Sequence, residues 1–161
     1  MERHVQEFNY FLFDSFDELS EADQILMQEA IAARKNAYAP YSKFQVGAAV
    51  ILKNGQIVIG NNQENASYPA GVCAERVAIL QAGAKYSDTI IKAVAISATS
   101  VNGVVDKPVS SCGICRQSMA EYEQKQNSPI KILMMGETGP VIKCDSVLHL
   151  LPFAFDSSFL K

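Results

Sequence analysis

The chain has 161 residues, the size of one domain, and 48% of them are hydrophobic, which is enough for a packed core and excludes a disordered chain. The formal net charge is −3, and only 19% of the residues are charged. This composition argues against a broad basic surface, so we expect neither nucleic acid nor a membrane as a partner.

The beginning of the chain carries no recognisable targeting signal. No stretch reaches the 18 apolar residues of a membrane span, and the apolar run 11–13 is too short for a signal-peptide core. We therefore expect a cytoplasmic protein with reduced cysteines. Residues 1–18 are rich in aromatic side chains, and we expect them to form an N-terminal extension that packs over the domain surface or a subunit contact. Residues 19–161 are then a single domain.

The first half of this domain reads as a helix followed by a β-hairpin. Ser20 is a typical N-cap, and apolar residues at helical spacing follow it until an Ala-Pro pair at 39–40 stops the helix. Alternating apolar residues predict a strand over 46–52. The Asn-Gly turn at 54–55 predicts that a second strand, over 57–59, returns antiparallel to the first.

The second half alternates between helices and strands. Its elements are a helix over about 73–82, a strand over 90–96, a helix over 113–125, a strand over 130–135, a short strand at 141–142 and a brief helix around 146–151. Helical crossovers make the second, third and fourth strands parallel, and a tight turn reverses the fifth. The predicted fold is an α/β protein, a three-layer α/β/α sandwich around a mixed five-stranded sheet.

Cysteine is the residue type that carries the chemistry, because only two histidines, His4 and His149, are present and neither is expected to have a catalytic role. Cys112 and Cys115 are spaced one helical turn apart, so both sulfurs can face one ion. Cys73 lies at the equivalent helix start of the neighbouring crossover, at the sheet edge where such folds bind ligands. Three thiolates select zinc and leave one position open, as in a catalytic site.

Two residues beside Cys73 suit this metal. Glu75 lies next to the open position, where a carboxylate can take a proton from a water on the metal and return it to a substrate. Zn²⁺ with three thiolates carries a formal charge of −1, which weakens it as an acid. Arg76 is a candidate donor to a thiolate, and such donors drain charge from the ligands. An isolated Cys-x-x-Cys also suits a redox pair or a structural zinc, but a redox pair leaves Cys73 and Glu75 without a role.

At this point the chain resembles a known family. The segments Cys-Ala-Glu-Arg at 73–76 and Cys-Gly-Ile-Cys-Arg-Gln at 112–117 resemble the small, homotetrameric, three-cysteine cytidine deaminases of nucleoside salvage. Segments 41–47, 62–68 and 150–155 extend the resemblance to most of residues 19–155. It implies one Zn²⁺ per chain and hydrolytic deamination of cytidine and 2′-deoxycytidine to uridine and 2′-deoxyuridine in pyrimidine salvage.

The resemblance also implies roles for residues that contact the nucleoside. Asn62 and Glu64 would hold the ribose hydroxyls, because an amide and a carboxylate can give and accept several hydrogen bonds to a diol. Contacts to the base would come from the ring of Phe44, the backbone of Ala74 and the carboxyl of Glu75. Three further residues would reach the site from neighbouring subunits of a homotetramer, namely Ala66, Tyr68 and Phe155.

Some positions depart from the family pattern. Ser111 and Gln45 stand where proline is usual, and Phe153 stands where glycine is usual, which bears on the direction of the following Phe155. Cys144 matches no ligand position and is expected to be a half-buried thiol.

Other functions stay open at this stage. Within the same fold, the alternative is a deaminase of another aminopyrimidine nucleoside such as blasticidin S. A nucleic-acid-editing deaminase fits less well, because basic stretches are missing. From a different class, a non-catalytic, zinc-stabilised binding module would have a closed site with Cys144 or a histidine as fourth ligand.

Overall fold

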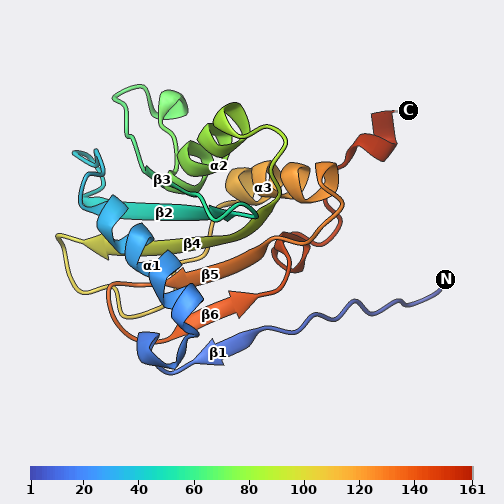
Figure 1. Cartoon of the computed structure of the whole chain (residues 1–161), viewed down its shortest axis with the longest axis horizontal. Helices are drawn as coiled ribbons and strands as arrows, with labels where there is room; N and C mark the ends of the chain where they lie inside the picture. The colour runs from blue at the N-terminus through green and yellow to red at the C-terminus, as the bar shows by residue number, and fades with distance from the viewer. Residues whose placement is uncertain (161) are drawn as a thin grey trace.

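A computed structural model describes residues 1–160. These residues form one sheet with helices on both faces (Figure 1). In chain order the elements are β1 (Phe11–Phe13), η1 (Phe16–Glu18), α1 (Glu21–Arg34), β2 (Phe44–Leu52), β3 (Ile57–Asn61), η2 (Tyr68–Ala70), α2 (Ala74–Lys85), β4 (Ile91–Ser100), α3 (Gly113–Lys125), β5 (Lys131–Met135), β6 (Val141–Cys144), η3 (Val147–Leu150) and η4 (Ser157–Leu160), where η marks a 3₁₀ helix.

The strands lie in the order β1-β6-β5-β4-β2-β3. β2 pairs antiparallel with both β3 and β4, whereas β4 and β5 are parallel neighbours and β6 reverses direction against β5. β3 therefore runs in the same direction as β4 and β5, which confirms the predicted directions. The carboxyl ends of β3 and β4 point toward the starts of α2 and α3, as a ligand site at that edge requires.

The prediction of five strands is wrong, because the described sheet has six. The additional strand, β1, lies inside the N-terminal extension and pairs antiparallel with β6, with Leu12 opposite Ile142 and Phe13 opposite Val141. Without it β6 would expose a row of unpaired backbone groups at the edge of the sheet. A run of three apolar residues is too short to show the alternation by which a strand is recognised in a sequence.

Two cores flank the sheet. α1 covers one face, where residues such as Met27 and Leu133 are buried, and α2 and α3 cover the other, around Ile79 and Met119 (Figure 1). These layers confirm the predicted three-layer sandwich.

A glycine fixes where α2 begins. A Cβ at Gly60 of β3 would lie 2.5 Å from the carbonyl oxygen of Ala74 and from the backbone nitrogen of Ala78. Only glycine therefore lets the first turn of α2 approach the sheet this closely. The same turn contains the residues around Cys73, so this contact sets the depth of the candidate site against the sheet.

Among residues 1–160, no helix combines the length and the apolar character that crossing a membrane requires.

Candidate active site

Three cysteines meet at the start of two neighbouring helices. Cys73 is the N-cap of α2, Cys112 is the N-cap of α3, and Cys115 lies in the first turn of α3. The Sγ atoms of Cys73 and Cys112 are 3.8 Å apart, and those of Cys112 and Cys115 are 3.5 Å apart. Zn–S bonds of about 2.3 Å in a tetrahedron place two sulfurs about 3.8 Å apart, so the spacing fits zinc. In the described part of the chain this is the only such group of potential metal ligands.

The electrostatic setting of the cluster favours thiolates. All three sulfurs lie at the amino-terminal ends of α2 and α3, where the helix dipole is positive. The hydrogen bond with Cys115 lowers the pKa of Cys73 to about 6, helped by Cys112 and by the charge of Arg76, although burial opposes the shift. The same contact with Cys73 raises the pKa of Cys115. The thiolate is the form of cysteine that binds a metal.

Glu75 follows Cys73 in the first turn of α2 and is buried, with only 4% of its surface exposed. Burial raises the pKa of its carboxyl, and the nearby charge of Cys73 adds to that effect. A raised pKa makes the Glu75 carboxylate a stronger base, which suits general acid–base chemistry.

Arg76 is the next residue along α2. Its Nε is buried and finds no hydrogen-bond partner among residues 1–160. A buried donor without a partner is rare and calls for a missing group. An anionic centre of one Zn²⁺ and three thiolates would provide a partner for this donor. The three cysteine sulfurs and their spacing suit the same metal.

A second group of polar residues lies where β3 ends and β2 begins. The Val46 N–H donates to Oδ1 of Asn62 (2.8 Å), and Nδ2 of Asn62 donates to the carbonyl of Phe44 (2.9 Å). The Asn62 amide thus continues the β2–β3 pairing through its side chain and fixes the backbone of Phe44. Both atoms of the amide keep one further hydrogen-bonding position.

Glu64 is held by the loop before β2. Its carboxylate accepts hydrogen bonds from the N–H groups of Tyr41 (2.9 Å) and Ser42 (3.2 Å) and from the Ser42 hydroxyl. The hydroxyl contributes most to lowering the pKa of Glu64, and the charge of Lys43 adds to it. The carboxylate is therefore ionised throughout the neutral range.

A cavity of about 400 Å³ opens at this place, lined by Tyr41, Ser42, Glu64, Asn65, Tyr68 and Gly71. The rings of Tyr41 and Tyr68 meet edge to face across it, with centroids 6.1 Å apart. The structure thus brings Tyr68 beside Glu64 of the same chain. Ala66 and Phe155 are exposed, and no described contact joins Phe155 to the cavity.

Comparison with known proteins agrees with this geometry. The sequence model of the family described as "Cytidine and deoxycytidylate deaminase zinc-binding region" matches residues 20–128. The chain belongs to this family. Relatives include the cytidine deaminase of Halalkalibacterium halodurans, 43% identical over 132 residues, which are 82% of this chain and 92% of that protein. The cytidine deaminase of Sporosarcina psychrophila is 39% identical over 84% of this chain and 93% of its own length.

Solved structures of cytidine deaminases share the fold. The crystal structure of cytidine deaminase from Burkholderia pseudomallei superposes with a TM-score of 0.71 at 35% identity, covering 85% of this chain and all of that one. Cytidine deaminase from Mycobacterium tuberculosis gives a TM-score of 0.61 at 30% identity, covering 85% and 98%. The zinc-binding family and the three-cysteine cluster together establish one Zn²⁺ site in this cytidine deaminase family member.

Three residues that organise the site carry no separate signal in the sequence. Ser42 donates a hydrogen bond that holds the Glu64 carboxylate, although the sequence indicated only the wider segment 41–47 as part of the family resemblance. Arg116 donates from Nε to the carbonyl of Ser111 (2.8 Å) and from Nη1 to that of Leu150 (2.8 Å), and Gln117 donates to Phe155. Both lie in the motif after Cys115, but their partners are distant in sequence and become visible only in the fold.

The remaining unusual residues lie outside the cluster. Cys144 is fully buried in β6, so the expectation of a half-buried thiol is wrong, and His149 stacks on Phe8 with ring centroids 5.8 Å apart. The Ser111 hydroxyl is buried and has no hydrogen-bond partner within the described chain.

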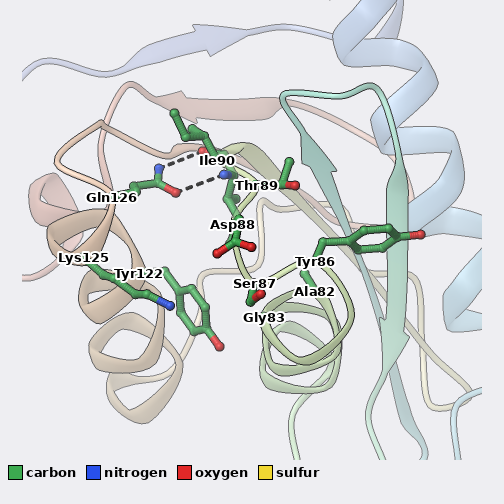
Figure 2. A pocket seen from close by; sticks show the side chains of 11 residues that line it. Ala82, Gly83, Tyr86, Ser87, Asp88, Thr89, Ile90, Tyr122, Lys125 and Gln126 are labelled. Atoms are coloured by element: carbon green, nitrogen blue, oxygen red, sulfur yellow. Dashed lines mark hydrogen bonds between the residues drawn. The ribbon is translucent and has the colours of Figure 1, made fainter.

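A different cavity, of about 210 Å³, lies at the opposite ends of α2 and α3. Figure 2 shows Tyr122 and Lys125 of α3 facing Ser87 and Asp88 of the connection between α2 and β4. The side chain of Gln126 closes one wall by bonding the backbone of Ile91 (both distances 2.9 Å). No residue of the predicted active site lines this cavity, which separates it from the zinc cluster.

Proposed function

We propose that the protein catalyses the hydrolytic deamination of cytidine and 2′-deoxycytidine to uridine and 2′-deoxyuridine. The observation that carries this proposal is the buried carboxyl of Glu75 directly beside three cysteines spaced for zinc. Relatives named cytidine deaminase, at 43% and 39% identity, support the nucleoside substrate.

Cys73, Cys112 and Cys115 would hold one Zn²⁺ per chain. When bound, zinc supplies an activated water as the nucleophile for C4 of the pyrimidine. Glu75 accepts a proton from the attacking water and delivers it to N3. It would then take the remaining proton from the new hydroxyl at C4 and give it to the exocyclic amine, so that the C4–N bond breaks, ammonia leaves and the C4 carbonyl of uridine forms. The raised pKa of Glu75 supports this role, because a more basic carboxylate takes the proton more readily.

The charge around the site supports the same reaction. Three thiolates leave zinc with a formal charge of −1, which by itself would make a poor acid. The unpartnered Nε of Arg76 and the amino-terminal ends of α2 and α3 offset that charge. Arg76 therefore acts on the metal through its ligands rather than on the substrate.

The nucleoside would lie between the cysteine cluster and the polar group at the end of β3. Asn62 has hydrogen-bonding capacity left after binding β2, and the ionised Glu64 accepts from hydroxyls, so the two suit a ribose. Phe44 would pack against the nucleoside, and the backbone of Ala74 with Glu75 would read the edge of the base.

Neighbouring subunits would complete the site. Tyr68 is 76% exposed and Phe155 is 55% exposed, and Ala66 is exposed as well. Large apolar side chains at the surface are typical of interfaces. We therefore propose a homotetramer in which these three residues contact the active sites of adjacent subunits. In each subunit, residues 19–161 would form a single domain preceded by the extension 1–18. A cytoplasmic role in pyrimidine salvage completes the proposal.

Zinc content and loss of cytidine absorbance, measured on the same preparations, test this function. We expect wild type to contain one zinc per chain and to convert cytidine and 2′-deoxycytidine. Glu75→Gln should keep zinc and lose at least about 100-fold in kcat, whereas Glu121→Gln, an exposed carboxylate of α3, should behave as wild type. A wild-type protein that binds zinc but converts only another aminopyrimidine, such as blasticidin S, would show the substrate to be wrong.

A further inference from the structure

The C-terminal segment leaves the domain in an open conformation. After η3, residues 151–156 form neither helix nor strand. The ring of Phe155 is 55% exposed and stacks on Phe159, with centroids 5.5 Å apart. Phe153 is 94% exposed and has a φ of 58°, the left-handed conformation that favours glycine. The core of its own chain thus does not fix the direction of the Phe155 ring.

The helix that presents two of the zinc ligands holds this segment. Nε2 of Gln117 donates to the carbonyl of Phe155 (2.8 Å), and Nη1 of Arg116 donates to the carbonyl of Leu150 (2.8 Å). Gln117 lies only two residues after Cys115, inside the first turns of α3. The part of α3 that sets the sulfur positions therefore also fixes two points along the C-terminal backbone.

We propose that Gln117 is a positioning residue, which fixes the backbone of Phe155 to the zinc-bearing helix and thereby sets the direction of the Phe155 ring toward substrate. The step to substrate rests on the proposed role of Phe155 at a nucleoside site. A hydrogen bond to the backbone carbonyl suits this role, because it restrains the segment without occupying the ring. Phe153 lies two residues before Phe155 and is the bulky residue that stands at the usual glycine position. Because its backbone is strained, the segment needs a restraint after Phe153 to hold Phe155 in place.

The test compares Gln117→Leu, which removes the donor at similar size, with Gln81→Leu on α2. Gln81 is exposed and makes no side-chain hydrogen bond described in residues 1–160, so it controls for the change in surface polarity and helix propensity. Hydrogen exchange of residues 151–160 reports on the restraint itself and needs no activity. We expect faster exchange there in Gln117→Leu only, with zinc content unchanged in both variants.

Kinetics on cytidine test the consequence for the site. Gln117→Leu should raise KM roughly three- to ten-fold, the range of one lost hydrogen bond, with a much smaller change in kcat. In the background of Phe155→Ala, Gln117→Leu should have no further effect on KM, because the ring through which Gln117 would act on the substrate is then absent. Additive effects on KM would mean that Gln117 acts independently of Phe155 and would overturn the proposal.

The remaining outcomes are also decisive. Loss of zinc in Gln117→Leu would assign Gln117 to the metal site. Equal hydrogen exchange of residues 151–160 in Gln117→Leu and Gln81→Leu would show that Gln117 does not restrain the segment. Either result overturns the proposal. If wild type leaves cytidine unchanged while exchange still distinguishes the two variants, the proposed substrate is wrong but the restraint on the C-terminal segment stands.

Discussion

The Ser42 hydroxyl donates a hydrogen bond to the carboxylate of Glu64, which fastens the loop before β2 to the chain that follows β3. Two backbone N–H groups of the same loop bind the same carboxylate. This contact lowers the pKa of Glu64 more than any other interaction does. The Glu64 carboxylate, which we propose binds the ribose, is therefore ionised and fixed in position before substrate binds.

Replacing Ser42 with alanine should change how KM depends on pH. The lowered pKa keeps wild-type Glu64 ionised below the usual range of a glutamate, whereas loss of the hydroxyl in Ser42→Ala moves the pKa up toward that usual range. KM for cytidine should therefore begin to rise at a higher pH in Ser42→Ala as the pH falls. Measuring KM between pH 4 and 7 checks this, with Ser87→Ala as control; superimposable profiles of Ser42→Ala and wild type would refute it.

The cysteines divide into ligands and a spare thiol. Cys112→Ala should remove a ligand and leave less than one zinc per chain, because two thiolates do not hold zinc tightly in an open site. Cys144→Ala should keep one zinc, at a cost of about 1 kcal/mol for the small cavity left by a buried thiol. Metal analysis and thermal unfolding measure both. Zinc loss in Cys144→Ala would instead indicate a closed, four-ligand site.

Arg76 is expected to affect chemistry more than binding of the metal or the substrate. Arg76→Gln removes the charge that helps to lower the pKa of Cys73 and leaves the thiolates less compensated. Loss of such supporting contacts at metal sites costs roughly 10- to 100-fold in metal affinity or activity. We expect kcat to fall within this range at saturating zinc, with KM little changed. Arg3→Gln, an exposed arginine of the extension, is the control.

Phe153 provides a direct test of backbone strain. Because its φ is 58°, glycine should be more stable than alanine there by roughly 0.5–1 kcal/mol, after the larger unfolded-state entropy of glycine offsets part of the gain. At Val104, which is exposed and outside the positive-φ set, alanine should be the more stable of the two. Thermal unfolding of the four variants decides the matter. The same order at both positions would mean that Phe153 is not strained.

The zinc cluster was predictable because its determinants are local. The spacing of Cys112 and Cys115 fixes one helical turn, and the alternation of elements places Cys73 at the neighbouring helix start. The six-stranded sheet was not predictable, because β1 is three residues long and becomes a strand only through its contact with β6. The attachment of Glu64 to Ser42 likewise depends on how two loops meet in three dimensions, which no local pattern contains.

The pairing of β1 with β6 also constrains how the molecule is assembled during synthesis. Phe13 is synthesised long before its partner Val141. Pairings between such distant residues form slowly, since a long loop must close first. Until then the apolar triplet of β1 and the neighbouring aromatic residues have no partner in the sheet. Completion of this edge is therefore a late event, and the apolar segment of β1 stays unpaired and prone to aggregation until β6 has been synthesised.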